Sequence, residues 1–445
     1  MKRIAGCTTL VLCVLLSADV RGNSYDLRDD NHMTPVKSQG GCGSCWCFGS
    51  LASVESTLLM HGGWQEDGWP DLSENHLNHW HGFDNIAACQ GGDYRMVAAY
   101  LGRGRGPVRE SDDPYPTNGT PAGDLDQPVC YTVKNIHWYT LTDDALGGID
   151  VIKNAVKTEG AIGTSIYYSA NFYSNGDFYQ PQSDSNDPNH SVCIAGWDDC
   201  HTVSGAPGDG AWLCKNSWGS SWNGDGYFWV SYYDKHACRN PEMGAVSFHD
   251  VVADNYAGIY NYDLHGWCKE KPVGYALNAF TAERSEMLTS AAFYTTADNV
   301  DYTLGVYSGL DDDNELTGLL TSKSGTIEFT GYHTIALDDP LMLNAGDNFL
   351  IMVHLSSGEH AIDATIEKTV LMGGDDPLVV SEANPGESWF STDGTTWEDL
   401  YDDGDTSANF CIKAFTEIPE PTTVTLLGLG LLCLVRRRRR LRNHE

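Results

Sequence analysis

The sequence predicts an α+β protein in two parts, a mixed domain of helices and strands followed by an all-β sandwich domain. Two observations predict this division. In the first part, apolar residues recur close to helical spacing: Phe48, Leu51, Ala52, Val54 and Leu58. From about Tyr256 the chain changes to short alternating strands, at residues 303–309, 349–355 and 410–415, with turns rich in Asp, Gly and Asn between them. We place the boundary near residues 251–255.

The N-terminus has the layout of a secretory signal peptide, which we assign to residues 1–22. Lys2 and Arg3 precede an apolar run at residues 10–16, and small and polar residues follow up to Asn23. We therefore expect an exported protein. Disulfides are the usual state of cysteines outside the cell, so a thiol that stays reduced there needs a reason.

The C-terminus carries a second sorting feature, at residues 419–441. The tripeptide Pro419-Glu420-Pro421 precedes an apolar run at residues 424–435 and arginines at residues 436–440. The run is shorter than the roughly 20 residues of a membrane-spanning helix. The order resembles the PEP-CTERM sorting signal of Gram-negative bacteria. This resemblance implies transient membrane association, processing by an exosortase-type enzyme, and delivery to the envelope, the cell surface or the extracellular space. The alternative is a simple C-terminal membrane anchor.

The formal net charge of -34 argues against nucleic acid as a partner, because nucleic acids are themselves polyanions. An acidic surface suits an exported, soluble protein. Loss of both terminal signals would remove Lys2, Arg3 and the arginines of the tail, and would make the mature protein more acidic still.

Three cysteines, Cys42, Cys45 and Cys47, lie within six residues and are candidates for disulfides, metal ligands or a nucleophile. Cys45 would lie in the first turn of the predicted helix, where backbone N–H groups and the helix dipole favour a thiolate. Far along the chain, His190 opens an apolar run, and Asn216 stands on the strand expected beside it. If the two strands pair antiparallel, Asn216 fixes the His190 tautomer and leaves the other ring nitrogen for Cys45.

Zinc is the main chemical alternative for this cluster, because Cys42 and Cys45 have the CxxC spacing of small zinc modules. Gln39, His190 and Asn216, however, have no role in such a module. We therefore expect neither a metal site nor a cofactor.

The first part resembles the papain family of cysteine proteases. The resemblance rests on stretches that follow the family's order between Tyr25 and about Val246: PVKSQGGCGSCWCFGS, LSENHL, CQGGDY, GPVRESDDPYP, NHSVCIAGWDD and KNSWGSSWNGDGYF. It implies a papain-like, two-lobed fold over residues 23–250, with a helical lobe and a β-barrel lobe. It also implies peptide-bond hydrolysis, with Cys45 as the nucleophile and His190 as the general base.

The resemblance assigns further residues around this pair. It implies that Asn216 orients His190, that Gln39 and the Cys45 backbone N–H donate to the tetrahedral oxyanion, and that Trp218 covers the contact between His190 and Asn216. We expect His190 and Cys45 to rest largely as an imidazolium and thiolate pair.

The resemblance also implies a disulfide between Cys42 and Cys89, followed by a substrate-binding strip. The glycines Gly91 and Gly92 would let a substrate backbone approach and bond to the main chain. Asp93 and Tyr94 would begin one wall of the specificity pocket. An acidic wall would favour basic substrate side chains, unless Asp93 points to solvent.

The other cysteines depart from the family pattern. Trp80 takes the place of the usual half-cystine partner of Cys130, and Cys47 is expected to be a buried thiol. Strand parity argues against a bridge between Cys193 and Cys214: if His190 and Asn216 share a face, these two side chains point to opposite faces. Two further pairings are hypotheses: Cys200 with Cys238, and Cys268 with Cys411.

Residues 256–417 resemble the lectin-like β-sandwich that follows papain-type domains in some bacterial and archaeal proteins. The resemblance is carried by strings such as YNYDLHGW, AAFYTTADNVDYTLGVY and NFCIKAFT, and it suggests a glycan or matrix ligand. Trp389 and Trp397 would stack on sugars or else fill the core. The turns LDDDNE and LYDDGDTSAN would bind calcium or else be solvated loops.

These features predict a secreted or surface-displayed bacterial cysteine endopeptidase that acts on peptide or protein substrates. The alternatives are a surface adhesin or matrix-binding protein with an inactive protease scaffold, and a transpeptidase that uses the same acyl-enzyme. The stretch before Tyr25 is too short to fill the cleft as a propeptide. We therefore hypothesise that the C-terminal part restrains activity or that no restraint exists.

Overall fold

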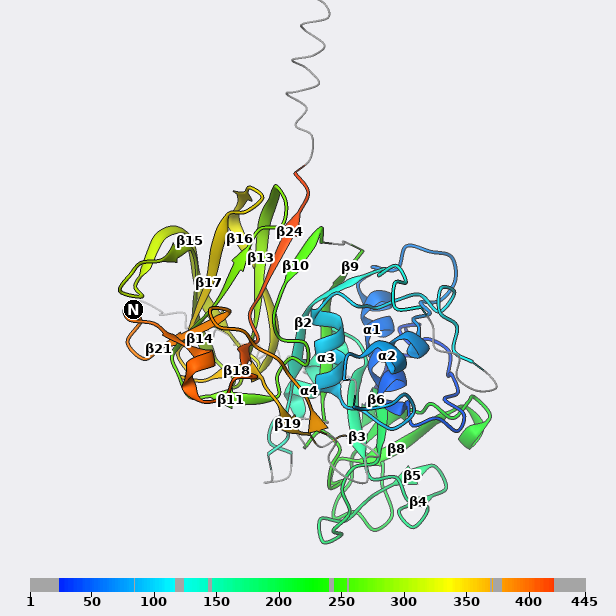
Figure 1. Cartoon of the computed structure of the whole chain (residues 1–445). Coiled ribbons are helices and arrows are strands. Elements are labelled where there is room, and N and C mark those ends of the chain that lie inside the picture. Colours follow the sequence, from blue (N-terminus) through cyan, green and yellow to red (C-terminus); the bar gives the residue numbers. More distant parts are fainter. Residues whose placement is uncertain are drawn as a thin grey trace, which may run out of the picture.

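The structure is a computed structural model that describes residues 24–419, except residue 84 and residues 117–123, 143–145, 240–243, 254–255, 369 and 371–377. Its two parts lie side by side (Figure 1). The expected signal peptide and the apolar run and arginines of the C-terminal segment fall outside the described residues. Within the described residues, no helix is both long and apolar enough to cross a membrane.

The helical lobe contains α1 (Cys45–Met60), α2 (Glu74–Trp80) and α3 (Tyr94–Gly102). The helix predicted behind Trp46 is confirmed as α1, and every residue from Cys45 to Leu58 is buried. A helix buried all round has to be enclosed by other elements. α1 packs against α2 and α3 on one side and against strands of the second lobe on the other, so the two lobes meet along it.

The barrel lobe is built on neighbouring strands in the order β2-β9-β3-β6-β7-β8. Their bounds are β2 (Thr132–Trp138), β3 (Ile162–Ile166), β6 (His190–Asp198), β7 (Ala211–Lys215), β8 (Tyr227–Ser231) and β9 (Val246–Val252). Smaller elements complete it: β1 (Ser24–Asp26), α4 (Ile149–Thr158), β4 (Tyr173–Ser174), β5 (Asp177–Phe178) and η1 (Trp222–Gly224). α1 packs against β3, β6 and β9.

The C-terminal part is the predicted all-β sandwich. One sheet has the order β10-β24-β13-β16, with β10 (Gly258–Tyr260), β13 (Glu286–Thr295), β16 (Gly331–Leu343) and β24 (Lys413–Glu417). The other has the order β15-β14-β17-β12-β21-β22, with β12 (Tyr275–Thr281), β14 (Val300–Leu310), β15 (Leu316–Ile327), β17 (Asn348–Leu355), β21 (Ser388–Ser391) and β22 (Glu398–Asp399), after which η2 (Leu400–Asp403) follows. Residues such as Leu304, Phe349 and Phe410 form the core of the sandwich.

The expected pairing of Cys268 with Cys411 is wrong, because a strand separates the two. A small sheet has the order β11-β18-β23, with β11 (Lys269–Lys271), β18 (His360–Asp363) and β23 (Asn409–Phe410), and β19 (Ile366–Glu367) pairs with β20 (Leu378–Val379). Cys268 N–H donates to Ile362 O at 3.0 Å and Cys411 N–H to Ala361 O at 3.1 Å, so the cysteines flank β18 from opposite sides.

The expected pairing of Cys200 with Cys238 is also wrong. Cys200 is exposed, in the turn after β6, whereas Cys238 is buried in the core of the barrel lobe. Cys193 and Cys214 form no disulfide either.

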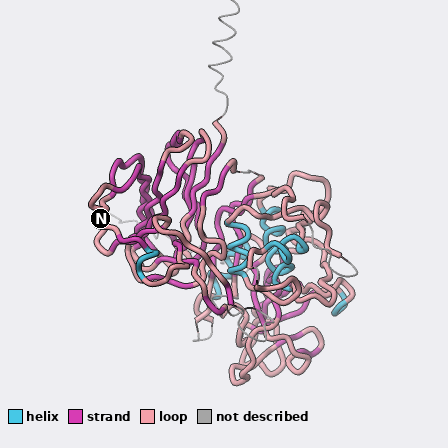
Figure 2. Tube along the Cα trace, in the orientation of Figure 1, coloured by secondary structure: helices cyan, strands magenta, loops and turns pink. Residues whose placement is uncertain are grey.

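The two parts share one continuous β-sheet. β16 of the sandwich pairs antiparallel with β2 of the barrel lobe, with Gly331 opposite His137 and His333 opposite Asn135. Strands β10, β24, β13 and β16 of the sandwich thereby join strands of the barrel lobe in a 13-stranded sheet among the described residues. Figure 2 shows strands in both parts in magenta. One apolar cluster likewise contains Trp46 and Tyr100 of the helical lobe together with Trp267 of the sandwich.

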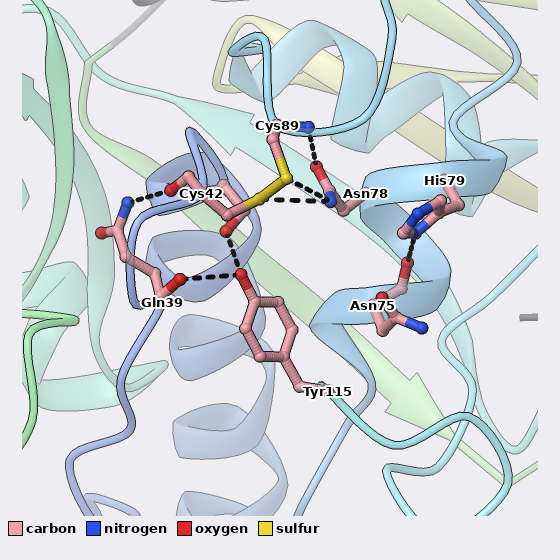
Figure 3. The surroundings of a disulfide bond; sticks show 8 residues. Gln39, Cys42, Asn75, Asn78, His79, Cys89 and Tyr115 are labelled. Carbon is pink, nitrogen blue, oxygen red and sulfur yellow. Dashed lines mark hydrogen bonds between the residues drawn. A yellow bond between two sulfur atoms is a disulfide. The ribbon is translucent and has the colours of Figure 1, made fainter. Parts of the chain in front are cut away.

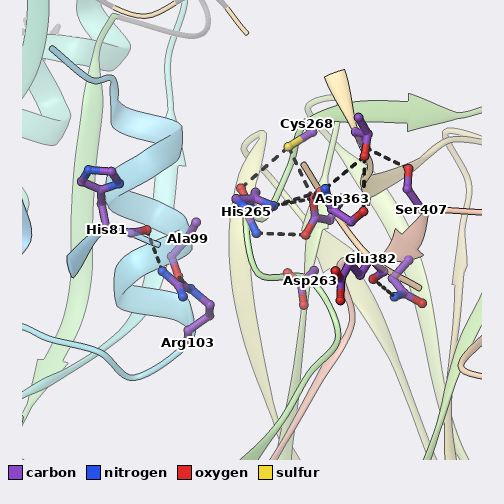
Figure 4. Close-up of polar contacts among 12 residues, drawn as sticks. His81, Ala99, Arg103, Asp263, His265, Cys268, Asp363, Glu382 and Ser407 are labelled. Atoms are coloured by element: carbon purple, nitrogen blue, oxygen red, sulfur yellow. Dashed lines mark hydrogen bonds and ion pairs between the residues drawn. The ribbon is translucent and has the colours of Figure 1, made fainter. Parts of the chain in front are cut away.

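Polar groups of both parts also face each other beside α3 (Figure 4). The Arg103 guanidinium donates to His81 O at 2.7 Å and to Ala99 O at 3.0 Å, and burial lowers its pKa to about 10. On the sandwich side, the Asp363 carboxylate accepts from His265 N–H at 2.9 Å. The His265 ring in turn lies 4.8 Å from the Phe83 ring of the helical lobe.

Candidate active site

Cys45 is the first residue of α1 and its side chain is completely buried. Burial raises the pKa of the Cys45 thiol to about 11, against the opposite effect of hydrogen bonds from the backbone N–H groups of Ser191, Trp46 and Cys45 itself. The N–H groups of Cys45 and Trp46 are donors that the N-terminus of α1 leaves available, whereas Ser191 belongs to β6. The bond from Ser191 also places the sulfur next to the start of β6.

His190 is the first residue of β6 and is buried. Its Nε2 lies 2.8 Å from Asn216 Oδ1, and the same oxygen accepts from Ser217 N–H at 2.8 Å. Because Oδ1 is an acceptor, Nε2 carries the proton in this contact and Nδ1 is left for another partner. The Trp218 ring is stacked on His190 at 4.6 Å, and Tyr168 packs edge-on against Trp218.

The structure therefore brings His190, Asn216 and Trp218 together, and α1, which begins with Cys45, packs against β6, which begins with His190 and pairs with β7. Burial lowers the pKa of His190 to about 4, and the bond to Asn216 acts in the opposite direction. Burial alone thus disfavours both the thiolate and the imidazolium, so these pKa shifts do not favour the expected resting ion pair. Charge can form here at low cost only if one proton transfer creates both ions at once, so that they attract each other.

Gln39 lies beside this group, held by two segments. Its Nε2 donates to Cys42 O at 2.7 Å and its Oε1 accepts from Ser217 Oγ–H at 2.6 Å. An amide nitrogen has two hydrogens, so one N–H of Gln39 is left for another acceptor. Its backbone N–H donates to Ser217 O at 2.8 Å, which fixes the segment against the one that carries Asn216.

A disulfide joins Cys42 to Cys89, as the resemblance implies, and Figure 3 shows its surroundings. The Asn78 amide contacts both sulfurs, at 3.6 and 3.8 Å, and its oxygen accepts from Cys89 N–H at 3.1 Å. Gly43 N–H donates to Cys89 O at 3.2 Å, and a Cβ at Gly43 would lie only 2.5 Å from that oxygen. The segment that leads into α1, which contains Cys42 and Gly43, is therefore fixed against the strip that follows Cys89.

Sequence reasoning missed Tyr115, which holds the segment before α1 through further hydrogen bonds. Its hydroxyl donates to Gln39 O at 3.0 Å and lies 2.8 Å from Ser44 Oγ (Figure 3). The ring packs edge-on against Phe48 of α1. A tyrosine in the GPVRESDDPYP stretch carries no local signal for this role, because the contact joins residues far apart in the sequence.

The side chains of Asp93 and Tyr94 do not form the expected wall of a specificity pocket. All four residues are buried. A Cβ at Gly92 would overlap the Trp46 ring, so this glycine serves core packing. Asp93 does not present a charge to a pocket: it is the N-cap of α3, and its carboxylate accepts from Met96 N–H at 2.9 Å. The Tyr94 side chain is wholly buried and reaches Ser191 Oγ at 2.5 Å.

A buried network of charges beneath the site was also missed. Lys37 Nζ contacts Glu55 and Glu74, each at 2.9 Å, and Thr34 links Glu55 to Lys215, the residue before Asn216. Burial raises the pKa of Glu74 to about 8, against the attraction of Lys37. The only sequence signal is a glutamate, Glu55, in the middle of a helix that is otherwise apolar or small.

In the sandwich, Trp397 is buried and belongs to a core cluster, whereas Trp389 is half-buried beside it. The Asp311 carboxylate in the first Asp-rich turn accepts from Asp313 N–H at 3.0 Å and Glu315 N–H at 2.9 Å. In the second turn, Asp405 pairs with Lys269 at 2.6 Å. Asp311 therefore stabilises its own turn, and Asp405 forms an ion pair.

Three family models match the chain. The model described as "Papain family cysteine protease" matches residues 22–247, "Lectin like domain" matches residues 259–416, and "PEP-CTERM protein-sorting motif" matches residues 417–440. The matches confirm the families predicted from the sequence.

The first part of the chain is similar in sequence to cathepsins. Cathepsin K of Mus musculus is 30% identical over 233 residues, which are 50% of this chain and 64% of that protein. Procathepsin L of Rattus norvegicus is 30% identical over 224 residues, which are 48% and 62%. The chain thus spans less than two thirds of the length of these relatives.

Two solved structures have the same architecture. The clostridial cysteine protease Cwp84 after propeptide cleavage has a TM-score of 0.75 at 24% identity, covering 89% of this chain and 99% of that one. The cysteine protease and lectin-like domains of Cwp84, a surface layer associated protein of Clostridium difficile, have a TM-score of 0.73 at 23% identity, covering 89% of each chain. This likeness confirms the fold, a papain-like domain followed by a lectin-like sandwich.

Proposed function

Because this chain belongs to the papain family of cysteine proteases, we propose that it is an exported endopeptidase that hydrolyses peptide bonds through an acyl-enzyme on Cys45. One observation carries the proposal. A buried thiol at a helix N-terminus lies beside β6, whose first residue, His190, is held by Asn216 at 2.8 Å. An inactive scaffold or adhesin has no need of this arrangement.

In the proposed reaction, His190 takes the proton of Cys45, and the thiolate attacks the carbonyl carbon of the peptide bond. The imidazolium then gives this proton to the departing amine as the C–N bond breaks, and the acyl group stays on sulfur. Neutral His190 next takes a proton from water, which attacks the thioester. The thiolate leaves and regains its proton from His190 as the acid product departs.

The oxyanion formed in each attack needs donors that are already in place. The second N–H of the Gln39 amide and the backbone N–H of Cys45 supply them in the proposal. Gln39 suits this role because its other amide groups are fixed by Cys42 and Ser217. Fixed donors stabilise a developing charge without reorganisation during the reaction.

The PEP-CTERM motif indicates export and a surface location. We propose that an exosortase-type enzyme processes the motif and that the mature protein is displayed on, or released from, the envelope of a Gram-negative bacterium. A glycan or matrix ligand of the sandwich would then place the protease near its protein substrates. The acidic composition, with a net charge of -34, suits a soluble protein outside the cell.

The test is cleavage of a mixed peptide library by the purified full-length protein, followed by mass spectrometry. The wild-type protein should cleave internal peptide bonds, Cys45→Ala should cleave none, and Cys47→Ala should keep the activity. Cys47 is a matched control because it is also a buried thiol of α1.

Two outcomes would contradict the proposal. A folded wild-type protein that cleaves no peptide would favour the inactive scaffold. Transfer of the acyl group to an added amine, with no hydrolysis, would favour the transpeptidase.

A further inference from the structure

We propose that a single water molecule occupies the cavity beneath the candidate active site and bridges the Asn216 amide to the Glu74 carboxylate. Glu74 is then a positioning residue that acts on His190 through Asn216. This inference rests on the proposed function and deepens it, because it gives a task to buried charges that the reaction itself does not use.

The cavity lies where the two lobes meet. It is lined from the helical lobe by Glu55 of α1 and Glu74 of α2, and from the barrel lobe by Lys215 of β7 and by Asn216, which follows β7. Each of these residues is at most 5% exposed. The cavity volume is about 10 Å³. A polar cavity of about 10–15 Å³ holds one water molecule if two to four polar groups bind it, so the size of this cavity fits a single water.

Two of the lining residues each have one polar atom that needs a partner. Among the described residues, Asn216 Nδ2 and Glu74 Oε2 are buried and form no hydrogen bond. The amide nitrogen is a donor and the carboxylate oxygen an acceptor, and a water molecule accepts from the one and donates to the other. Buried polar groups are normally hydrogen-bonded, because an unpaired group loses its hydration without compensation.

The other polar atom of each side chain is already bound. Asn216 Oδ1 lies 2.8 Å from His190 Nε2 and accepts from Ser217 N–H at 2.8 Å. Glu74 Oε1 accepts from Lys37 Nζ at 2.9 Å. These contacts fix the orientation of both side chains and leave Nδ2 and Oε2 for the water.

Lys215 supplies a third partner. Its Nζ donates to Thr34 Oγ1 at 2.9 Å, and an ammonium group has three N–H groups, so another one is available for the water. The water then accepts from Lys215 and Asn216 and donates to Glu74, a set of partners that one water molecule satisfies. The ammonium group also disfavours a metal cation at the same place, because like charges repel.

The bridge restrains the plane of the Asn216 amide. When the water holds Nδ2, Oδ1 of the same rigid amide group stays directed at His190. Beside metal-bound histidines, loss of such an outer hydrogen-bond partner costs about 10- to 100-fold in affinity or activity. We expect a loss of the same order in kcat when Glu74 no longer accepts from the water. KM should change little, because the buried Glu74 side chain does not reach a substrate.

The experiment combines a high-resolution crystal structure of the full-length protein with the kinetics of two variants. The wild-type structure should show one water within hydrogen-bond distance of Asn216 Nδ2 and Glu74 Oε2. Glu74→Gln keeps the shape of the side chain and an acceptor for Lys37, but turns an amide donor toward the water. Its kcat should fall about 10-fold or more, with KM nearly unchanged.

Asp113→Asn is the matched control. Asp113 is also a buried carboxylate beside α2, where it accepts from the Asn75 amide at 2.7 Å, but it does not line the cavity. This variant should keep the wild-type kcat. Thermal unfolding checks that both variants fold.

A wild-type structure in which Asn216 Nδ2 bonds to a protein atom, or in which other buried waters are resolved but none lies in this cavity, would overturn the inference. A folded Glu74→Gln protein with the kcat of the wild type would overturn it as well. Absence of peptide cleavage by the wild type would instead count against the proposed function. The crystal structure decides on the water even if Glu74→Gln does not fold.

Discussion

At the scale of single residues, the site depends on a balance between burial and local donors at Cys45. Burial raises the thiol pKa to about 11, while N–H groups at the start of α1 and at Ser191 act against it. The resemblance led to Cys45, His190, Asn216 and Gln39 because motifs mark these positions. Their physical setting, a thiol wholly enclosed by the two lobes, followed only from the fold.

A substitution at Gln39 should weaken oxyanion binding and leave the activation of the Cys45 thiol unchanged. Gln39→Ala should lower kcat about 100-fold or more, because one fixed donor to the oxyanion is lost. The rate of Cys45 alkylation by iodoacetamide should change little, since Gln39 makes no hydrogen bond to this sulfur among the bonds of the described residues. Thermal unfolding serves as the control for folding. An unchanged kcat would contradict the assignment of the oxyanion donor.

At the scale of elements, Asp93 shows why a motif alone misplaces a side chain. The resemblance put Asp93 at a pocket wall, but the residue directly before a helix is also the place of the N-cap, and here the cap decides where the carboxylate points. The periodicity of α1 and the alternating strands of the sandwich were predictable, because local sequence determines them. The direction of a side chain at the end of an element depends on its three-dimensional neighbours.

A substitution pair at Asp93 tests this reading. Asp93→Ala should lower the free energy of unfolding by about 1 kcal/mol, because the Met96 N–H loses its partner. Asp93→Asn keeps a capping oxygen and should be nearly as stable as the wild type. Neither change should alter how fast peptides with basic side chains are cleaved relative to other peptides, measured with the same peptide library. Slower relative cleavage of the basic peptides by Asp93→Asn would contradict this assignment and support an acidic pocket wall.

At the scale of the whole molecule, the two parts form one structure through the pairing of β2 with β16. No local pattern could predict it, because nearly 200 residues separate His137 from His333. The sandwich contacts β2, α3 and the segment around Phe83, and its Leu378 O accepts from the Asn85 amide at 2.6 Å. Removal of the sandwich to test it as a restraint would therefore also uncover the shared core.

Three histidines meet at this junction and make it sensitive to acid. The His137 ring lies 4.0 Å from His249 and 5.3 Å from His333, and His249 donates to Glu159 at 2.9 Å, which also lies 3.5 Å from His61. Burial, together with the neighbouring histidines, lowers the pKa of His137 to about 2 and that of His333 to about 4. Both rings are therefore neutral in the folded protein at neutral pH.

The sign of the pH effect follows from these shifts. The unfolded chain takes up protons below a pKa of about 6.5, whereas the folded chain does not until far lower pH, so stability falls as the pH drops. We expect a loss on the order of 2 kcal/mol per histidine between pH 7.5 and 5. The bond from His249 lowers the pKa of Glu159 to about 2, so this carboxylate changes stability mainly below this window.

Denaturant unfolding at several pH values measures the effect. His137→Gln and His333→Gln should each flatten the dependence between pH 7.5 and 5, because the substituted side chain does not titrate. A stability that is equal at both ends of this window in the wild type, or a slope that neither substitution changes, would contradict the account.

The most direct test of the central claim is the second-order rate of Cys45 alkylation in the wild type and in His190→Ala, with the modified residue identified by mass spectrometry. The account predicts fast modification of Cys45 at pH 7 in the wild type. In His190→Ala no imidazole takes the proton of the thiol, so the rate at pH 7 should be far lower and should rise only at alkaline pH. Equal rates at pH 7, or faster modification of another cysteine than of Cys45 in the wild type, would contradict the claim that His190 activates this sulfur.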